Sequence, residues 1–97
     1  MKAWKAFERD MAAIFGGKRF WANSGERLDF ETPTVKAQCK LVKQMSLEQV
    51  TRLAEEMQRE AGEKLGIVCI KVRRGRGQPS EPLIVVTAKQ WAQWYGD

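Results

Sequence analysis

Three polar side chains that could act together on a phosphate ester occur close to one another in the sequence. Asp29 precedes the pair Gln38 and Lys40, and alternation of apolar and polar residues predicts that all three point to one face of a β-hairpin. Carboxylate, amide and main-chain carbonyl oxygens are ligands of Mg²⁺ or Mn²⁺, and an ammonium group can stabilise a phosphate. A solvated sheet face with cross-strand Asp–Lys pairing is the simpler interpretation, and periodicity alone favours it.

The chain contains no histidine, and this absence excludes much of hydrolytic chemistry. Ser-His-Asp hydrolysis, Cys-His proteolysis and His-ligated zinc all need that residue. Any catalysis must therefore use carboxylates, lysines, amides or hydroxyl groups. Cys39 and Cys69 form no CxxC motif and no disulfide framework, which favours a reducing cytoplasm.

Charge and length restrict the partners. The 97 residues include 17 Lys plus Arg against 12 Asp plus Glu, a net charge of +5 that is spread over both halves of the chain. Such a balance favours a polyanionic partner such as nucleic acid over a membrane surface. No apolar run approaches the roughly 20 residues of a transmembrane helix, and charged residues near the N-terminus argue against a signal peptide. We expect one soluble domain over residues 1–97.

Local patterns predict the elements that would position the polar residues. Apolar residues from Trp4 to Ile14 predict an amphipathic helix ending at Gly16-Gly17. Residues 27–31 and 35–41 alternate on either side of Thr32-Pro33-Thr34, which predicts a hairpin.

The second half of the chain predicts a helix, two strands and a short helix. Ser46 and Gln49 form a capping-box pattern before an apolar face that begins at Leu47. Residues 66–72 and 82–86 are β-branched runs typical of strands covered on both faces, and Thr87 caps the last helix. The expected fold class is α/β (α+β), with a mixed β-sheet flanked by helices.

The motifs together resemble a known nuclease core. Asp29, the segment Gln38-Cys39-Lys40 on the next strand, the capped helix and the two apolar strands resemble the PD-(D/E)XK superfamily, whose core is restriction-endonuclease-like. The second motif is usually Glu-X-Lys there, and glutamine in place of the glutamate is known among members. Phe7-Glu8-Arg9-Asp10 and Ser24-Gly25 are similar to elements of archaeal-type Holliday junction resolvases, some of which bacteriophages carry. The resemblance covers most of the chain and is strongest from Phe7 to Lys40.

The resemblance implies an endodeoxyribonuclease that resolves four-way DNA junctions by paired phosphodiester hydrolysis. It places Mg²⁺ or Mn²⁺ on Asp29, Gln38, Glu8 and the carbonyl of Cys39. Lys40 would orient or activate the attacking water. Two symmetric cuts need two sites, so a homodimer is expected, with no membrane partner and no small-molecule cofactor. A flap or nicking nuclease, or a non-catalytic DNA-binding module of the same fold, remains an alternative.

Further residues would hold the nucleic acid. The resemblance implies that Arg9 and Ser24 contact the backbone phosphate, with Ser24 among the catalytic residues beside Glu8, Asp29, Gln38 and Lys40. The other residues expected to bind DNA are Lys36, Lys43, Arg73, Arg74 and Arg76. Because Gln38 carries no charge, Glu31 is a candidate to supply a further acidic ligand. The aromatic residues Trp4, Trp21, Trp91, Trp94 and Tyr95 could stack on unpaired bases, although packing in the core or in a dimer is the favoured interpretation for most of them.

Overall fold

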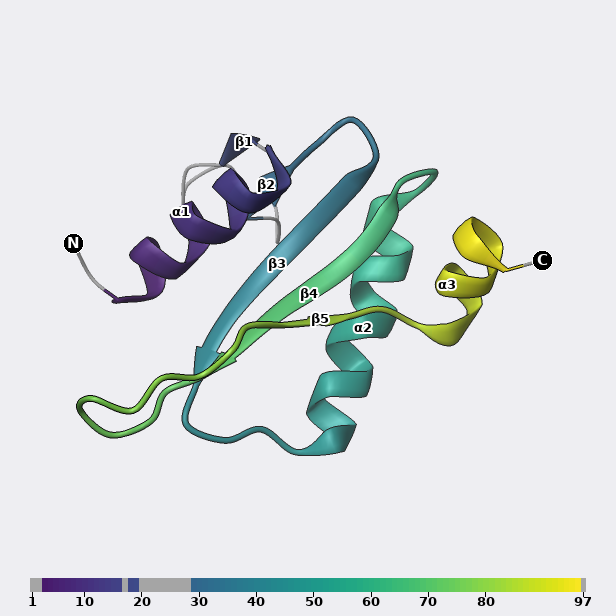
Figure 1. The fold of residues 1–97 in the computed structure, drawn as a ribbon. Helices are drawn as coiled ribbons and strands as arrows, with labels where there is room; N and C mark the ends of the chain where they lie inside the picture. Colours follow the sequence, from purple (N-terminus) through teal and green to yellow (C-terminus); the bar gives the residue numbers. More distant parts are fainter. Residues whose placement is uncertain (1–2, 17, 20–28, 97) are drawn as a thin grey trace.

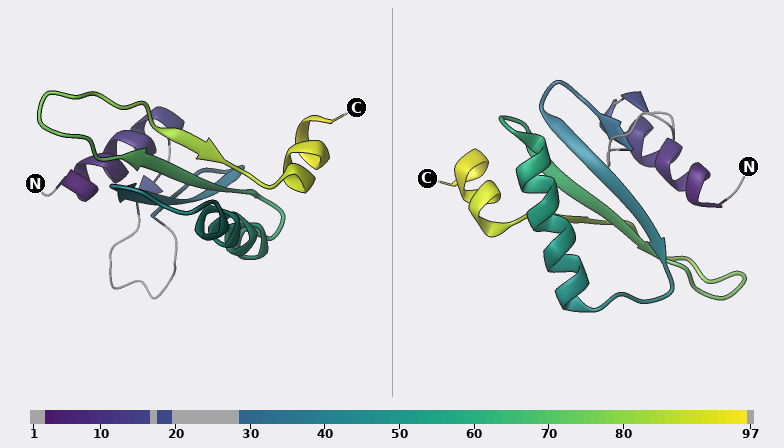
Figure 2. Two further views of the ribbon diagram at one scale, coloured as in Figure 1. Left: turned by 90° about the horizontal axis from the view of Figure 1, so that it is seen from below. Right: turned by 180° about the vertical axis from the view of Figure 1, so that it is seen from behind.

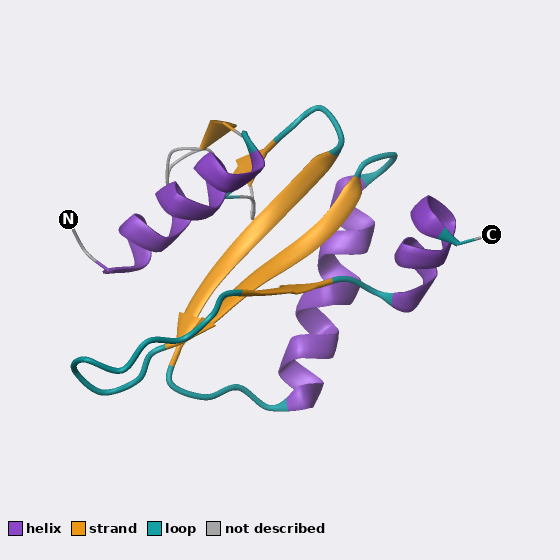
Figure 3. Ribbon diagram, in the orientation of Figure 1, coloured by secondary structure: helices purple, strands orange, loops and turns teal. Residues whose placement is uncertain are grey.

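A mixed five-stranded sheet organises the chain (Figure 1). The computed structural model describes residues 3–16, 18–19 and 29–96. Its elements are α1 (Ala3–Phe15), β1 (Lys18–Arg19), β2 (Phe30–Glu31), β3 (Val35–Val42), α2 (Leu47–Ala61), β4 (Leu65–Val72), β5 (Leu83–Val85) and α3 (Ala88–Tyr95). The strand order is β1-β2-β3-β4-β5, with β3 and β4 parallel and the other described pairs antiparallel. The predicted mixed sheet with flanking helices is confirmed (Figure 3).

The parallel pairing follows from α2, which carries the chain from the end of β3 back to the start of β4. The helices α1 and α2 cover opposite faces of the sheet (Figure 2). Phe7 and Met11 of α1 pack on one face, whereas Met57 of α2 packs on the other, against Val68 and Ile70 of β4. Since side chains alternate along a strand, β4 contributes to both apolar clusters.

The local signals that predicted the helices are present in the structure. The chain leaves α1 at Gly16, whose φ of 66° is one that glycine adopts at little cost. At the start of α2, the Ser46 hydroxyl accepts the amide N–H of Gln49, and the Gln49 side chain accepts the N–H of Ser46. The predicted cap at Thr87 also forms, because its hydroxyl accepts the N–H of Gln90. None of the described helices is long and apolar enough to span a membrane.

Several burial predictions are wrong. Leu47, Ile14 and Trp4 follow the helical apolar pattern, yet all three side chains are exposed, Trp4 and Leu47 in the first turn and Ile14 in the last turn of its helix. The prediction of strands covered on both faces is right for β4 and wrong for β5. β5 lies at the sheet edge, and both Leu83 and Ile84 are exposed.

A buried glutamine closes the edge of β4 beyond the end of β5. The Gln90 side chain accepts the N–H of Gly66 at 2.7 Å and donates to the carbonyl of Gly66 at 2.9 Å, so it replaces the backbone of a neighbouring strand. Gly66 has no room for a side chain, because a Cβ there would overlap the carbonyl oxygen of Met57 in α2. Gly66 is thus the place on β4 where Gln90 joins α3 to the sheet and where α2 packs tightly against the strand.

We expect Gln90→Ala to lower the free energy of unfolding by about 1–3 kcal/mol, because it leaves the two polar groups of Gly66 unpaired near the core. Equilibrium unfolding in urea would measure the change. Gln93→Ala, at an exposed position of the same helix, is the matched control. Equal stability of the two variants would contradict the role given to Gln90.

Candidate metal and phosphate site

Asp29 lies directly against β3, at the point where the backbone pairing of β2 stops. Its amide N–H donates to the carbonyl of Ala37 at 2.8 Å. Its carboxylate accepts the amide N–H of Cys39 at 2.6 Å. The side chain therefore continues the hydrogen bonding along the edge of β3, and the carboxylate is held beside the segment Gln38-Cys39-Lys40. The hairpin pattern predicts that Asp29 lies beside this segment, whereas convergence of its carboxylate with the side chains of Gln38 and Lys40 stays a prediction.

The carbonyl oxygen of Cys39 shares this edge. In an extended strand, the N–H and C=O of one residue point to the same neighbouring strand. Because the N–H of Cys39 reaches Asp29, its carbonyl also points toward the β2 side of β3. A carboxylate and a main-chain carbonyl are thus available next to each other.

Gln38 and Lys40 point to the opposite sheet face from the Cys39 side chain. Cys39 and Ala37 pack with the cluster under α1, so alternation directs Gln38 and Lys40 to the face of α2. The Gln38 Oε1 atom is buried and has no hydrogen-bond partner among the described residues. A buried acceptor without a partner is costly, so this oxygen is suited to a ligand.

Glu8 approaches Cys39 from the other face. It is a buried residue of α1, the helix that packs on the side of the sheet to which the Cys39 thiol points. The pKa of that thiol is raised well above its usual range, first by a hydrogen bond with the Cys69 side chain. Burial and the negative charges of Asp29 and Glu8 raise this pKa further. Glu8 and Asp29 therefore both act on one residue of β3, although they belong to separate elements.

The sequence pattern does not reveal Cys69 as the neighbour of Cys39. The two residues are directly paired in the parallel register of β3 and β4. Both cysteines are free. Since a raised pKa keeps the Cys39 thiol protonated, it is a small apolar group at neutral pH and not a nucleophile.

Glu31 is not placed to assist Asp29. Its carboxylate pairs with Lys64 at 3.0 Å, and Lys64 also donates to the carbonyl of Thr32 at 2.9 Å. These contacts hold the turn after β2 against the start of β4. The suggestion that Glu31 supplies an extra acidic ligand is therefore wrong, because the lysine already neutralises it.

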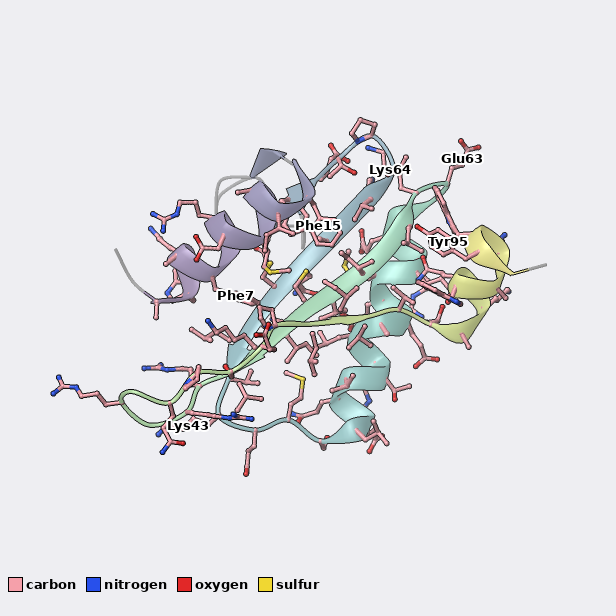
Figure 4. The ribbon with its side chains drawn as sticks, in the orientation of Figure 1. Phe7, Phe15, Lys43, Glu63, Lys64 and Tyr95 are labelled. Atoms are coloured by element: carbon pink, nitrogen blue, oxygen red, sulfur yellow. The ribbon has the colours of Figure 1, made fainter. Side chains whose placement is uncertain are left out.

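The basic residues predicted to bind DNA lie in two places: on β3 and just after it, and in the loop between β4 and β5. Lys36 lies on β3 with its side chain toward the α2 face, as does Lys40. Lys43 follows the end of β3, beside the loop that joins β4 to β5 (Figure 4). That loop carries the exposed arginines Arg73, Arg74 and Arg76.

Internal hydrogen bonds shape the basic loop. Arg74 donates to the carbonyl of Pro79 at 2.9 Å, and the Ser80 hydroxyl donates to the carbonyl of Val72 at 2.6 Å. A hollow of about 320 Å³ lies between this loop and the start of α1, and its lining includes Lys71, Arg73 and Arg74. The loop thus presents cations in a defined arrangement.

Arg9 and Ser24 are the other two residues predicted to contact phosphate. Arg9 is exposed on α1 and pairs with Asp10 at 3.3 Å. Ser24 lies outside the described residues, as does Trp21. Among the described residues, no three histidine, cysteine, aspartate or glutamate side chains gather as a metal-binding group. A cation here would need the oxygens of Gln38 and of the Cys39 carbonyl in addition to carboxylates.

Comparison with known proteins adds no assignment: no family model matches the chain, and no curated protein or solved structure is significantly similar to it. What the protein does must therefore be inferred from its own residues.

The raised pKa of Cys39 predicts a loss of stability at alkaline pH. A cysteine in the unfolded chain ionises near pH 8.5, whereas Cys39 in the folded protein keeps its proton. Above that pH the unfolded state binds fewer protons than the native state, so the free energy of unfolding falls as the pH rises.

Cys39→Ala is expected to reduce this alkaline loss, measured by urea unfolding between about pH 8 and pH 10 with a chelator present. The wild-type protein is the reference, because the two proteins differ only in this side chain. An identical pH dependence of the two would contradict the interpretation.

Proposed function

We propose that this protein is a metal-dependent DNA endonuclease of the PD-(D/E)XK type that cuts four-way junctions. The observation that carries the proposal is the contact of the Asp29 carboxylate with the N–H of Cys39, between Gln38 and Lys40. The acid that precedes β2 is thereby held against the main chain of β3, between the residues that carry an amide and an ammonium group. A solvated surface with a simple Asp–Lys pair does not account for the Gln38 oxygen, which is buried and has no partner in the part of the chain that the structure describes.

The oxygens at this edge suit a hard divalent cation. Asp29 has two carboxylate oxygens, of which one accepts the Cys39 N–H, so the other can bind a cation. The carbonyl of Cys39 and the Oε1 atom of Gln38 add two neutral oxygens. Glu8 lies on the opposite face of the sheet from Gln38, so its place among the ligands rests on the resemblance alone. Mg²⁺ and Mn²⁺ prefer oxygen ligands and keep several waters. When bound, the cation would offset charge that develops on the phosphate and make a water more acidic.

The residues of the chain have separate tasks in phosphodiester hydrolysis. The N–H of Cys39 fixes the orientation of the Asp29 carboxylate. Lys40 places a positive charge on the same sheet face as Gln38, where it can stabilise charge on the phosphate or orient the attacking water. Glu8 is buried and approaches from α1, so it adds negative charge without being exposed to bulk solvent.

The surface around the site suits the DNA backbone. Lys36 and Lys43 extend the positive charge along β3, and Arg73, Arg74 and Arg76 extend it beyond the end of the strand. Gly75 and Gly77, beside the arginines, allow close approach of the main chain to a phosphate. The two free cysteines support an assignment to the cytoplasm.

A non-catalytic DNA-binding module is the second candidate, and Gln38 favours it. Replacement of the usual glutamate by an amide removes one negative charge from the cation site, and a module that only binds DNA needs no cation. A flap or nicking nuclease would use the same residues with a different DNA shape.

Cleavage of a synthetic four-way junction tests the proposal. The wild-type protein is expected to make paired, symmetric cuts with Mg²⁺ or Mn²⁺ and none with a chelator. Asp29→Ala and Lys40→Ala should each lower the rate by about 100-fold or more, as expected for loss of transition-state charge stabilisation. Lys89→Ala, which removes the same charge from an exposed position on α3, should cleave like the wild type.

DNA binding without cutting under every metal condition would contradict the nuclease assignment and support the second candidate. Cutting of a linear duplex at an equal rate would contradict the preference for junctions.

Gln38→Glu tests the ligand role of Gln38. The added carboxylate should tighten Mn²⁺ binding, measured by titration calorimetry, and lower the metal concentration needed for half-maximal cleavage. Gln93→Glu makes the same change on exposed α3 and should leave both quantities unaltered. Unchanged or weaker Mn²⁺ binding by Gln38→Glu would count against Gln38 as a ligand.

A further inference from the structure

The hollow between the start of α1 and the loop from β4 to β5 is a site of its own. Its volume is about 320 Å³, at the lower end of the roughly 300–1,000 Å³ that small-molecule sites occupy. Figures 1 and 2 show that the loop extends past the end of the sheet on the side where α1 begins. Leu41 lines the hollow and packs with the cluster under α1, whereas Gln38 and Lys40 point to the face of α2. We call this space the α1–loop hollow.

One wall of the α1–loop hollow is apolar. Ala3, Ala6 and the buried Phe7 line it from α1. Leu41 of β3 and Val72 of β4 continue the same surface from the sheet. None of these five side chains offers a hydrogen bond, and the small alanines leave space above them. Such a wall suits the face of a planar ring, because nucleobases pack between aromatic and apolar side chains.

The opposite wall carries positive charge. Lys71, Arg73 and Arg74 line the hollow from the end of β4 and from the loop. Asp10 of α1 also lines it, but its carboxylate pairs with Arg9 at 3.3 Å. Cations therefore exceed acids in the lining. Lysine ammonium and arginine guanidinium groups are the usual protein partners of a phosphate.

The cationic wall is held in place by bonds within the loop. Arg74 donates to the carbonyl of Pro79 at 2.9 Å, and its other guanidinium N–H groups can still donate to an anion. The Ser80 hydroxyl donates to the carbonyl of Val72 at 2.6 Å. Because the loop is already ordered by these contacts, less conformational entropy is lost when a ligand binds. The side-chain amide of Gln78 completes this wall, and such an amide can pair with the edge of a base.

We propose that the α1–loop hollow binds one nucleotide. The phosphate lies against Lys71, Arg73 and Arg74, and the base lies on the apolar wall of α1. Inorganic phosphate would leave that wall unused, and an aliphatic anion would leave the Gln78 amide without a partner. A nucleotide combines an anion, a planar face and a hydrogen-bonding edge, so it matches all three parts of the lining.

The nucleotide has two possible sources, a free nucleotide or an unpaired position in a DNA strand. A base inside an intact duplex is stacked between its neighbours, so only an unpaired or extruded base can enter the hollow. The DNA source rests on the proposed function. It adds to that function a preference for DNA with unpaired bases, which contact with backbone phosphates alone does not produce.

Fluorescence anisotropy of two labelled single strands tests the proposal. One strand carries its bases, and the other has the same phosphates with abasic positions. The wild type is expected to bind the first strand about tenfold more tightly, as for the stacking of one base. Ala6→Leu fills the apolar wall, so it should remove this difference and leave binding of the abasic strand unchanged. Arg73→Ala should weaken binding of both strands alike.

Ala13→Leu is the matched control, because it makes the same change at an exposed position of α1 outside the lining. It should keep the tenfold preference. Circular dichroism checks the folding of each variant. Ala3→Leu, at an exposed position of the same wall, replaces Ala6→Leu if that variant does not fold.

Calorimetry with deoxyadenosine monophosphate distinguishes the two sources. Binding that Ala6→Leu abolishes, without a base preference between the strands, assigns the hollow to a free nucleotide. A base preference that Ala6→Leu abolishes assigns it to DNA. Equal binding of both strands with no binding of the monophosphate would overturn the proposal, as would a base preference that persists in Ala6→Leu.

The proposed nuclease activity can fail or hold independently of this site. A base preference in a protein that cuts no DNA would keep the inference and contradict the proposed function. Metal-dependent cutting of junctions by a protein that binds neither the base nor the monophosphate would do the reverse. Asp29→Ala, which alters the candidate cation site on the edge of β3, should keep the base preference.

Discussion

The parallel pairing of β3 with β4 is the interaction on which the rest of the structure depends. It requires a crossover, which α2 supplies, and it places β4 in the middle of the sheet with both faces covered. The tight contact of α2 with Gly66 shows how closely the crossover packs, because a side chain there would overlap the carbonyl of Met57. β3 is then left with one edge for the short strand β2.

That remaining edge of β3 defines the candidate site. β2 is only two residues long, so the backbone ladder ends early and the carboxylate of Asp29 takes up the N–H of Cys39. On the other side of Cys39, the register with β4 fixes Cys69 as its neighbour. The same strand pairing therefore holds the Asp29 carboxylate against the main chain of Cys39 and sets the Cys39 thiol beside Cys69.

The two edges of the sheet have opposite chemical character. Near β2, the strand β3 carries lysines and the buried oxygen of Gln38, which has no partner among the described residues, whereas β5 and α3 present exposed apolar side chains. Lys64, which pairs with Glu31, and Gln90, which pairs with Gly66, hold the outer elements to the central strands. The proposed chemistry and the exposed apolar side chains thus lie on separate surfaces of the molecule.

The sequence by itself determined the helices, the hairpin and the meeting of Asp29 with Gln38-Cys39-Lys40, because caps, turns and alternation act over a few neighbouring residues. Only the tertiary structure decided that β5 is an edge strand, that Glu31 pairs with Lys64 and that Cys39 lies beside Cys69. The exposure of Leu47 and of the α3 aromatic residues was decided in the same way. These features depend on which distant segments pair and on where each helix extends beyond the sheet, and a local pattern records neither.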